Sequence, residues 1–341
     1  MSIRVAVYGL GPIGTLIAKE VLKKEDLNLV AAFDVDPEKV GKDLGTILGI
    51  NEKLGVSIEH DANAVEILKN SGVKVVLHST STYLDKNYTQ IVRCIEAGAS
   101  VISTCETLSN AWYRYPELAT LINELARKHC VSVIATGVNP GFIFETLPSL
   151  LTAVCTNVES IHVIRSLDAS KRRQSFQKKY GLGLEIGEFK VKMANGLLSA
   201  HTGYGESITL VSEALGIDLS RIVEDQEPLI AKKDMSTQFF EVKKGSVSGI
   251  HGFGIGFIEE KEFIKLELFA EADREEFEEI SIKGTPSIVW RSSGTAGDIA
   301  TAAMVINMIP KILSARPGLL RMYDIPFPSA FINIKEKEEM Q

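Results

Sequence analysis

The sequence contains few cysteines, and they form no recognisable arrangement. Cys94, Cys105, Cys130 and Cys155 each stand alone, with no CxxC pair and no Cys/His pair at zinc spacing. We therefore expect neither a disulfide framework nor a metal site. The simplest prediction is that these cysteines are small residues in or near the core, kept reduced.

Long hydrophobic runs and an excess of basic charge are also missing. No apolar stretch approaches the ~20 residues that span a bilayer, and the chain begins directly in a strand-like pattern without a secretory segment. The net charge of −7 argues against a protein that binds nucleic acid or a membrane surface through phosphate attraction. We expect a cytoplasmic protein with neither kind of partner.

The first 140 residues alternate between strand-like and helix-like patterns. Helical periodicity follows Pro12, recurs near residues 86–97 and returns from Pro116 to Lys128. The predicted strands are residues 3–9, 28–34, 73–79, 100–104 and 131–136. Such alternation predicts an α/β fold, a Rossmann domain with a doubly wound parallel sheet covered on both faces.

The pattern changes after the segment Asn139-Pro140-Gly141. Four half-exposed strands are predicted at residues 157–166, 247–258, 262–271 and 277–283, with little helix among the last three. They predict a second, α+β domain built on an open mixed sheet.

A helical pattern returns from Gly294. It has Ile299, Ala303, Ile306 and Ile309 on one face, and Pro310 should end or kink it. At 341 residues two domains are expected. We assign residues 1–140 with about 295–341, including a charged tail from Ile334, to the first domain, and residues 141–294 to the second.

The first strand is followed by the spacing G-x-G-x-x-G, formed by Gly9, Gly11 and Gly14. Pro12 and Ile13 complete the loop and open the helix. In this strand–loop–helix context the glycines predict a tight turn, close approach of a dinucleotide pyrophosphate, and helix–strand packing. The helix N-terminus would meet the phosphates. The alternative is a glycine-rich structural turn.

Two carboxylates lie at and just beyond the end of the second predicted strand. Asp34 lies twenty residues after Gly14, where a carboxylate commonly accepts the ribose hydroxyls. Asp36 would repel a 2′-phosphate, which favours NAD over NADP. Lys39 and Lys42 are close enough in sequence to keep NADP possible, and Asp36 can equally be a turn residue.

Further polar residues end other strands of the predicted parallel sheet. Ser79, Thr80 and Ser81 follow the third clear strand, and Asn139 follows the last. Open parallel sheets bind ligands at the carboxyl ends of their strands, so these residues are candidates for contacting the cofactor. Loop and turn chemistry explains them equally well.

Several motifs together resemble one enzyme family. Besides the glycine loop, they are Asp34-Val35-Asp36-Pro37, Ser103-Thr104-Cys105-Glu106, Ala135-Thr136-Gly137-Val138-Asn139-Pro140-Gly141-Phe142 and Gly297-Asp298-Ile299-Ala300-Thr301-Ala302-Ala303-Met304. Across nearly the whole chain they resemble 2,4-diaminopentanoate dehydrogenases and the related native amine dehydrogenases. The broader relatives are dihydrodipicolinate reductases, whose paired-histidine motif this sequence lacks.

The resemblance implies that Glu106 is the catalytic carboxylate. Oxidative deamination needs a neutral amine, because an ammonium has no lone pair to drive hydride departure. A carboxylate beside the reacting carbon can take that proton, stabilise the iminium cation and activate the attacking water. Without the resemblance, a solvated loop glutamate explains Glu106 about as well.

The resemblance also implies a reaction and a set of contacts. The expected activity is NAD(P)-dependent oxidative deamination of a primary amine, reversibly the reductive amination of a ketone with ammonia. The leading substrate is 2,4-diaminopentanoate, which places the enzyme in amino acid degradation, and a homodimer is expected. Arg172 or Arg173 would hold the substrate carboxylate, although such a basic run is often simply solvated. The candidate pocket residues are Phe142, Phe176 and His201.

Three alternatives remain open from the sequence. The first is an amine dehydrogenase for simple ketones and aldehydes, and the second is a dihydrodipicolinate-type reductase, which the missing histidine pair disfavours. The third is a non-catalytic dinucleotide sensor, which would not need Glu106.

Overall fold

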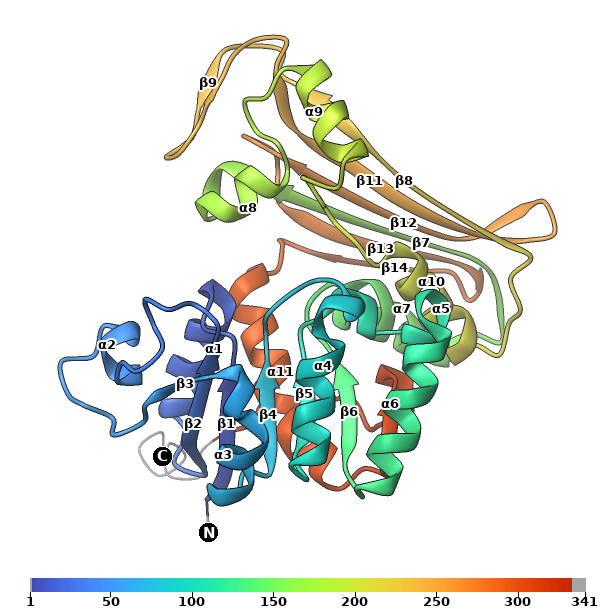
Figure 1. Cartoon of the computed structure of the whole chain (residues 1–341). Helices are drawn as coiled ribbons and strands as arrows, with labels where there is room; N and C mark the ends of the chain where they lie inside the picture. Colours follow the sequence, from blue (N-terminus) through green and yellow to red (C-terminus); the bar gives the residue numbers. More distant parts are fainter. Residues whose placement is uncertain (1, 333–341) are drawn as a thin grey trace, which may run out of the picture. The chain divides into compact units, whose positions relative to one another are not determined.

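The structure is a computed structural model in which residues 2–332 are described. The charged tail predicted from Ile334 lies outside the described residues. The chain forms two compact units, one from Met1–Phe142 with Ala296–Gln341 and the other from Ile143–Thr295 (Figure 1). No helix among the described residues is long and apolar enough to cross a membrane.

The first unit is built on a seven-stranded sheet, and all its neighbouring strands pair in parallel. The order is β15-β6-β5-β4-β1-β2-β3. The bounds are β1 Ile3–Tyr8, β2 Leu27–Asp34, β3 Ile58–His60, β4 Val75–His78, β5 Ser100–Ser103, β6 Ser132–Ala135 and β15 Gly318–Leu320. The predicted parallel sheet is confirmed, while the two three-residue edge strands β3 and β15 were not predicted because they are too short to show periodicity.

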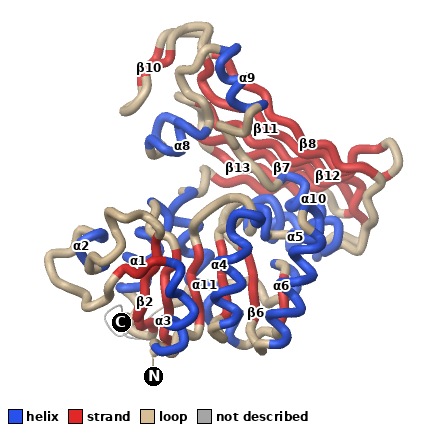
Figure 2. Tube along the Cα trace, viewed as in Figure 1, coloured by secondary structure: helices blue, strands red, loops and turns tan. Residues whose placement is uncertain are grey.

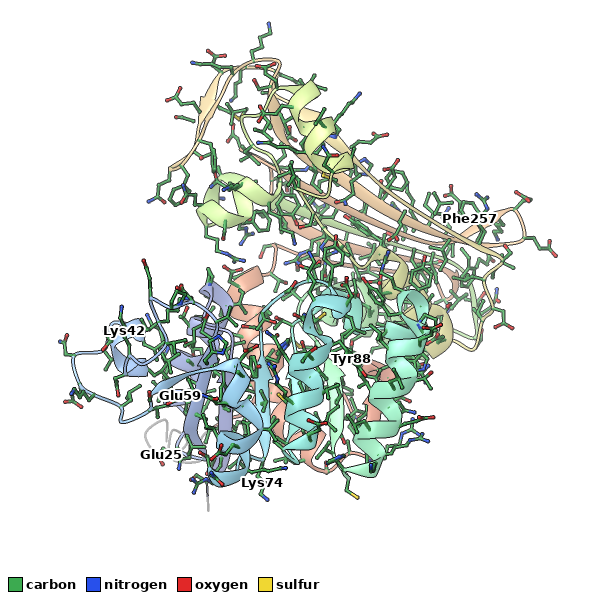
Figure 3. The ribbon with its side chains drawn as sticks, viewed as in Figure 1. Glu25, Lys42, Glu59, Lys74, Tyr88 and Phe257 are labelled. Atoms are coloured by element: carbon green, nitrogen blue, oxygen red, sulfur yellow. The ribbon has the colours of Figure 1, made fainter. Side chains whose placement is uncertain are left out.

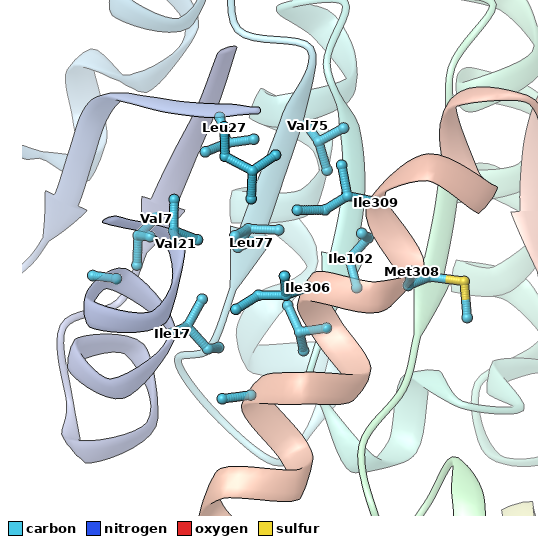
Figure 4. Packing of buried hydrophobic residues seen from close by; sticks show 14 of the residues in the cluster. Val7, Ile17, Val21, Leu27, Val75, Leu77, Ile102, Ile306, Met308 and Ile309 are labelled. Carbon is cyan, nitrogen blue, oxygen red and sulfur yellow. The ribbon is translucent and has the colours of Figure 1, made fainter. Parts of the chain in front are cut away.

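Helices cover both faces of this sheet. Helices α1 (Pro12–Leu22) and α11 (Gly297–Leu313) pack on one face, as the close view of the buried cluster shows (Figure 4). Helices α3 (Ala64–Asn70), α4 (Leu84–Glu96) and α6 (Pro116–Lys128) pack on the other face. Successive side chains of β1 point to opposite faces of the sheet, so the strand contributes to both hydrophobic cores. Val5 and Val7 belong to one core, and Ala6 and Tyr8 belong to the other. The short helices α2 (Leu44–Leu48) and α5 (Ala111–Arg114) lie in connections.

Helix α11 differs from its prediction in two respects. It continues past Pro310 to Leu313, so the proline does not end it. Pro310 lies exposed in the last turn, between the buried anchors Ile309 and Ile312, whose packing holds that turn on the sheet. The buried face was also misassigned, because Ile299 is 64% exposed.

The cysteine prediction holds in part. Cys94 and Cys105 are buried, Cys155 is half-buried, and Cys130 is exposed. Cys130 has a positive φ of 55° at the turn between α6 and β6, so its position is set by the turn and it does not belong to the core. No group of metal-binding side chains occurs in the described part of the chain.

The second unit contains a six-stranded mixed sheet in the order β14-β13-β7-β12-β11-β8 (Figure 2). Only the β7–β12 pair is parallel, which confirms the open mixed sheet. The strands are β7 Asn157–Asp168, β8 Arg221–Ile230, β11 Val247–Ile258, β12 Lys261–Glu271, β13 Phe277–Thr285 and β14 Ile288–Ser292, with a small ribbon of β9 Met235–Ser236 and β10 Glu241–Val242. The helices are α7 Leu147–Leu151, α8 Gln174–Lys179, α9 Ile186–Ala194 and α10 Tyr204–Ala214.

A row of glycines in β11 brings helix α10 close to this sheet. A Cβ at Gly252 would lie 2.1 Å from the Tyr204 hydroxyl, and one at Gly254 would lie 2.7 Å from the Tyr204 Cβ. The third member of the row, Gly256, would meet Ile208 in the same way. The glycines therefore serve the packing of this helix on the sheet.

Candidate functional site

The first unit has its topological switch point between β1 and β4. From β1 the strand order runs outward in one direction through β2 and in the other through β4, so the loops that follow β1 and β4 diverge. Open parallel sheets bind ligands in the crevice at this position. The loop after β1 carries Gly9, and the loop after β4 carries Ser79 and Thr80.

The three glycines of the first loop have three different surroundings. Gly9 has φ +90°, and a Cβ there would lie 2.4 Å from the Ser79 carbonyl oxygen. A Cβ at Gly14 would lie 1.8 Å from the Gly9 carbonyl oxygen, so Gly14 permits the close packing of α1 against the end of β1. Gly11 has nothing within 4 Å of a Cβ position and caps α1 with extended backbone. The open space therefore lies at Gly11, where a pyrophosphate would approach the helix N-terminus.

Asp34 is held firmly at the end of β2. One carboxylate oxygen accepts the Leu10 N–H at 2.8 Å, and the other accepts the Val35 and Asp36 N–H groups. Burial opposes ionisation of Asp34, but these hydrogen bonds and Lys39 outweigh it and hold its pKa below the ordinary value. The carboxylate thus ties the glycine loop to β2 and remains ionised.

Lys39 lies between the two predicted ribose-side carboxylates. Its Nζ is 3.2 Å from Asp34 Oδ2 and 3.4 Å from Asp36 Oδ2. Lys42 lies further along the same connection, on the segment leading into α2 (Figure 3). Of the two lysines considered from the sequence, the structure places Lys39 beside Asp34 and Asp36.

Glu106 and Asn139 follow the carboxyl ends of β5 and β6. Glu106 is half-buried and begins a short 3₁₀ turn, Glu106–Leu108. The side-chain amide of Asn139 is buried, and neither its nitrogen nor its oxygen has a hydrogen-bond partner among the described residues. An unsatisfied buried amide implies a missing polar partner, and the carboxamide of a nicotinamide can both donate to it and accept from it. Cys105 is a buried packing residue. Burial raises the pKa of its thiol to about 11, so the thiol stays protonated and does not serve as a base.

These features fit a nicotinamide dinucleotide along the carboxyl edge of the sheet. The open space at Gly11 would take the pyrophosphate, Asp34 the adenosine ribose, and Asn139 the nicotinamide amide. Ser79 and Thr80 line the same loop, while Ser81 uses its carbonyl to accept a hydrogen bond from Asn87.

The second unit carries a separate polar cluster on the covered face of its sheet. Arg165 on β7 is 4% exposed and lies directly opposite Glu278 on β13, with Arg165 Nε 3.3 Å from Glu278 Oε1. Glu278 also accepts hydrogen bonds from Ser292 and Thr295. Burial lowers the pKa of Arg165, and Glu278 opposes that effect.

The sequence-predicted substrate residues are distributed unevenly around this cluster. Arg172 forms an ion pair with Glu276, and its Nε is buried without a partner among the described residues. Arg173 donates instead to Ser175 at an exposed position. His201 is buried, and its Nε2 has no hydrogen-bond partner in the described part of the chain. Burial together with the charges of Lys179 and Arg165 lowers its pKa well below the ordinary value.

Two predicted pocket aromatics occupy different units. The ring of Phe176 on α8 packs in a tilted arrangement on Tyr180, with 4.3 Å between the ring centroids, in the second unit. Phe142 is partly buried against the hydrophobic core of the first unit.

Sequence reasoning overlooked two buried polar residues, Arg165 and His78. Arg165 follows Ile161 and Val163 at every second position of β7, and this inward-facing register could have identified it. His78 ends β4 with no exposed surface, and only its strand-end position could have indicated it.

Two family models together cover almost the whole chain. Residues 142–341 match the model described as the 2,4-diaminopentanoate dehydrogenase C-terminal domain, and residues 3–110 match that described as dihydrodipicolinate reductase, N-terminus.

Individual relatives agree with these models. The chain is 32% identical to a 2,4-diaminopentanoate dehydrogenase of Acetoanaerobium sticklandii, covering 97% of this chain and 95% of the relative. It is 24% identical to an amine dehydrogenase of Streptomyces virginiae over 98% and 99% of the two chains. The solved amine dehydrogenase of Mycobacterium smegmatis has the same fold, with a TM-score of 0.85, 22% identity and coverage of 96% and 97%.

A pair of alanine substitutions separates binding from packing in the glycine loop. In Gly11→Ala the new methyl group enters open space at an ordinary φ of −72°. Because this space is open without the cofactor, we expect normal thermal unfolding. When the pyrophosphate occupies the space, the added methyl group should weaken NADH binding roughly tenfold, since overpacking costs about 1–3 kcal/mol.

Gly14→Ala is the matched comparison. Its Cβ collides with Gly9, so we expect it to lower the unfolding temperature. Fluorescence titration with NADH and thermal unfolding measure both effects, and wild-type affinity in Gly11→Ala would contradict the assignment.

Proposed function

This chain belongs to the 2,4-diaminopentanoate dehydrogenase family, and from that premise we propose that it deaminates 2,4-diaminopentanoate oxidatively with a nicotinamide dinucleotide. The reverse reaction is the reductive amination of a ketone with ammonia. The observation that carries the proposal is the position of Glu106 at the end of β5, on the same sheet edge as the glycine loop and the unsatisfied Asn139 amide. A carboxylate at this edge is where amine chemistry needs one.

Glu106 serves in this proposal as the proton acceptor. It takes a proton from the substrate ammonium, which restores the lone pair that drives hydride departure from the carbon. The bound nicotinamide supplies the acceptor for that hydride. Once Glu106 has passed that proton to solvent, its carboxylate stabilises the iminium charge and takes a proton from the water that attacks the iminium carbon. Because Glu106 is half-buried, its charge acts at lower effective dielectric than in bulk water.

Replacement of this one carboxylate tests the assignment. We expect Glu106→Gln to fold and to bind NADH, but to lose about 10²–10⁴-fold in kcat, the usual contribution of a positioned acid–base group. Glu96→Gln makes the same chemical change at an exposed position on α4 and should leave kcat unaltered. Turnover of Glu106→Gln equal to that of Glu96→Gln would remove Glu106 from the mechanism.

The acid group of the substrate needs a cationic partner. Arg165 is the better candidate than the predicted Arg172 and Arg173, because it is the most buried of the three and its buried Nε has no hydrogen-bond partner among the described residues. The charge of Arg172 acts on Arg165, so the two guanidinium groups lie near each other. A carboxylate that leaves bulk water requires such donors to replace its hydration.

Kinetics on two substrates test this contact. Arg165→Lys keeps the charge but loses the planar fork, so we expect KM for 2,4-diaminopentanoate to rise about tenfold or more. KM for a 2-aminoalkane should change little, and Arg173→Ala should affect neither substrate. If both KM values rise together in Arg165→Lys, Arg165 does not bind the substrate carboxylate. A simple amine without an acid group then becomes a better candidate substrate than 2,4-diaminopentanoate.

The cofactor preference follows from the charges beside Asp34. Asp36 disfavours a 2′-phosphate by repulsion, so NAD is the proposed cofactor. Lys39, which now pairs with both carboxylates, is the cation that would make NADP tolerable. The net charge of these three side chains is one negative.

Substitutions of Lys39 and Asp36 should act in opposite directions. We expect Lys39→Ala to weaken NADP binding several-fold more than NAD binding, since a charged hydrogen bond contributes about 1.5–3 kcal/mol. Asp36→Ala should narrow the gap between the cofactors, and Lys42→Ala serves as the control. Titrations of both cofactors decide this, and tighter wild-type binding of NADP than NAD would contradict it.

The proposal includes a homodimer. The face of the second sheet that carries Ile164, Phe253 and Ile255 is opposite the one on which α10 packs, and Val289 on this face is 70% exposed. A second copy would bury these apolar side chains. Sedimentation equilibrium tests the assembly, with twice the chain mass of 37.3 kDa supporting it and the single mass contradicting it.

A further inference from the structure

A chain of buried polar groups connects two strand-end loops of the first unit. His78, the last residue of β4, is fully buried between them. Its Nδ1 lies 2.8 Å from the Ser103 hydroxyl at the end of β5. Its Nε2 lies 3.0 Å from both the Thr80 hydroxyl and the Gln90 Oε1.

The partners fix the direction of these hydrogen bonds. Gln90 Oε1 can only accept, so the hydrogen between it and His78 is carried by Nε2. The Cys105 N–H donates to Ser103 Oγ at 3.1 Å, and the Ser103 hydroxyl donates to the unprotonated Nδ1. Nδ1 then accepts, and Nε2 carries the ring hydrogen and donates toward Thr80 and Gln90. Burial lowers the pKa of His78 to about 4, so the ring is neutral near neutral pH and this arrangement is complete there.

Each end of the chain reaches a part of the proposed site. At one end, Thr80 packs against the first glycine, where a Cβ on Gly9 would lie 2.7 Å from Thr80 Cγ2. Thr80 also donates to Asn87 Oδ1 or to Gln90, which anchors the loop on α4. At the other end, the Cys105 N–H belongs to the residue immediately before Glu106.

We propose that His78 is a positioning residue, whose two ring nitrogens set separately the dinucleotide loop through Thr80 and the Glu106 turn through Ser103. The proposal rests on the function proposed above, because it assigns the two ends to cofactor and to proton transfer. The hydrogen bonds of the His78 ring go to Ser103, Thr80 and Gln90, and none goes to Glu106 or to the glycine loop. Its effect on the reaction is therefore exerted through Thr80 and the Cys105 backbone.

Two amide substitutions of His78 each keep the hydrogen bond of one ring nitrogen and remove that of the other. The amide of His78→Asn reaches the Nδ1 position and can still accept from Ser103, but it loses the Nε2 contact. The amide of His78→Gln reaches the Nε2 position and can still donate to Thr80, but it loses the acceptor for Ser103. Ser103→Ala and Thr80→Val remove the same two contacts from the partner side, and they replace either histidine variant that does not fold.

Loss of the Nε2 contact should affect cofactor binding, and loss of the Nδ1 contact should affect turnover. We expect His78→Asn and Thr80→Val to raise the Kd for NADH about three- to tenfold, with kcat nearly unchanged. We expect His78→Gln and Ser103→Ala to lower kcat by a similar factor with little change in Kd. These factors correspond to the loss of one hydrogen bond. Hydrogen–deuterium exchange should be faster at residues 104–106 in the second pair only.

Tyr8→Phe is the control for a merely structural effect. The Tyr8 ring lies 5.6 Å from the His78 ring but takes no part in these hydrogen bonds. Tyr8→Phe should therefore change neither kcat nor the Kd for NADH. The proposal is overturned if His78→Asn and His78→Gln change Kd, kcat and exchange alike. A wild-type protein that binds NADH but deaminates no amine would refute the proposed function alone, because Kd and exchange would still test the division.

Discussion

The close approach of helix α1 to the end of β1 is the constraint on which the first unit depends. A Cβ at Gly14 would lie 1.8 Å from the Gly9 carbonyl oxygen, so only glycine lets the two elements meet at this distance. The contact directs the N-terminus of α1, with its unsatisfied N–H groups, at the switch point of the sheet. Asp34 reinforces it by accepting the Leu10 N–H from inside the same loop.

Parallel strand order then gathers residues that are far apart in the sequence. Asp34, Thr80, Glu106 and Asn139 each lie at or just after the carboxyl end of a different strand, and all those strands end at one edge of the sheet. The edge carries complementary groups, with helix N–H donors at one point and carboxylates at others. This arrangement suits a ligand with a negative pyrophosphate and hydroxyl-rich sugars, and it places the Glu106 carboxylate at the same edge for the proposed proton transfer.

The positions of these strand-end residues could be predicted from the sequence because the signals there are local. A glycine spacing, a strand-end aspartate and a strand-end glutamate can be recognised without knowing what lies opposite them. Long-range partners cannot, since nothing near His78 in the sequence indicates Ser103, and nothing near Arg165 indicates Glu278. The same limit explains α11, where packing of Ile309 and Ile312 on the sheet overrides the helix-ending tendency of Pro310.

The central claim is that this chain couples loss of an amine to reduction of a nicotinamide dinucleotide. The most direct test mixes the purified protein with NAD and 2,4-diaminopentanoate, and follows reduced cofactor by absorbance and ammonia by a separate assay. Reduced cofactor and ammonia should form in equal amounts, and neither should form when either reactant is omitted. Cofactor reduction without ammonia, or tight NADH binding with no reduction on any primary amine, would contradict it.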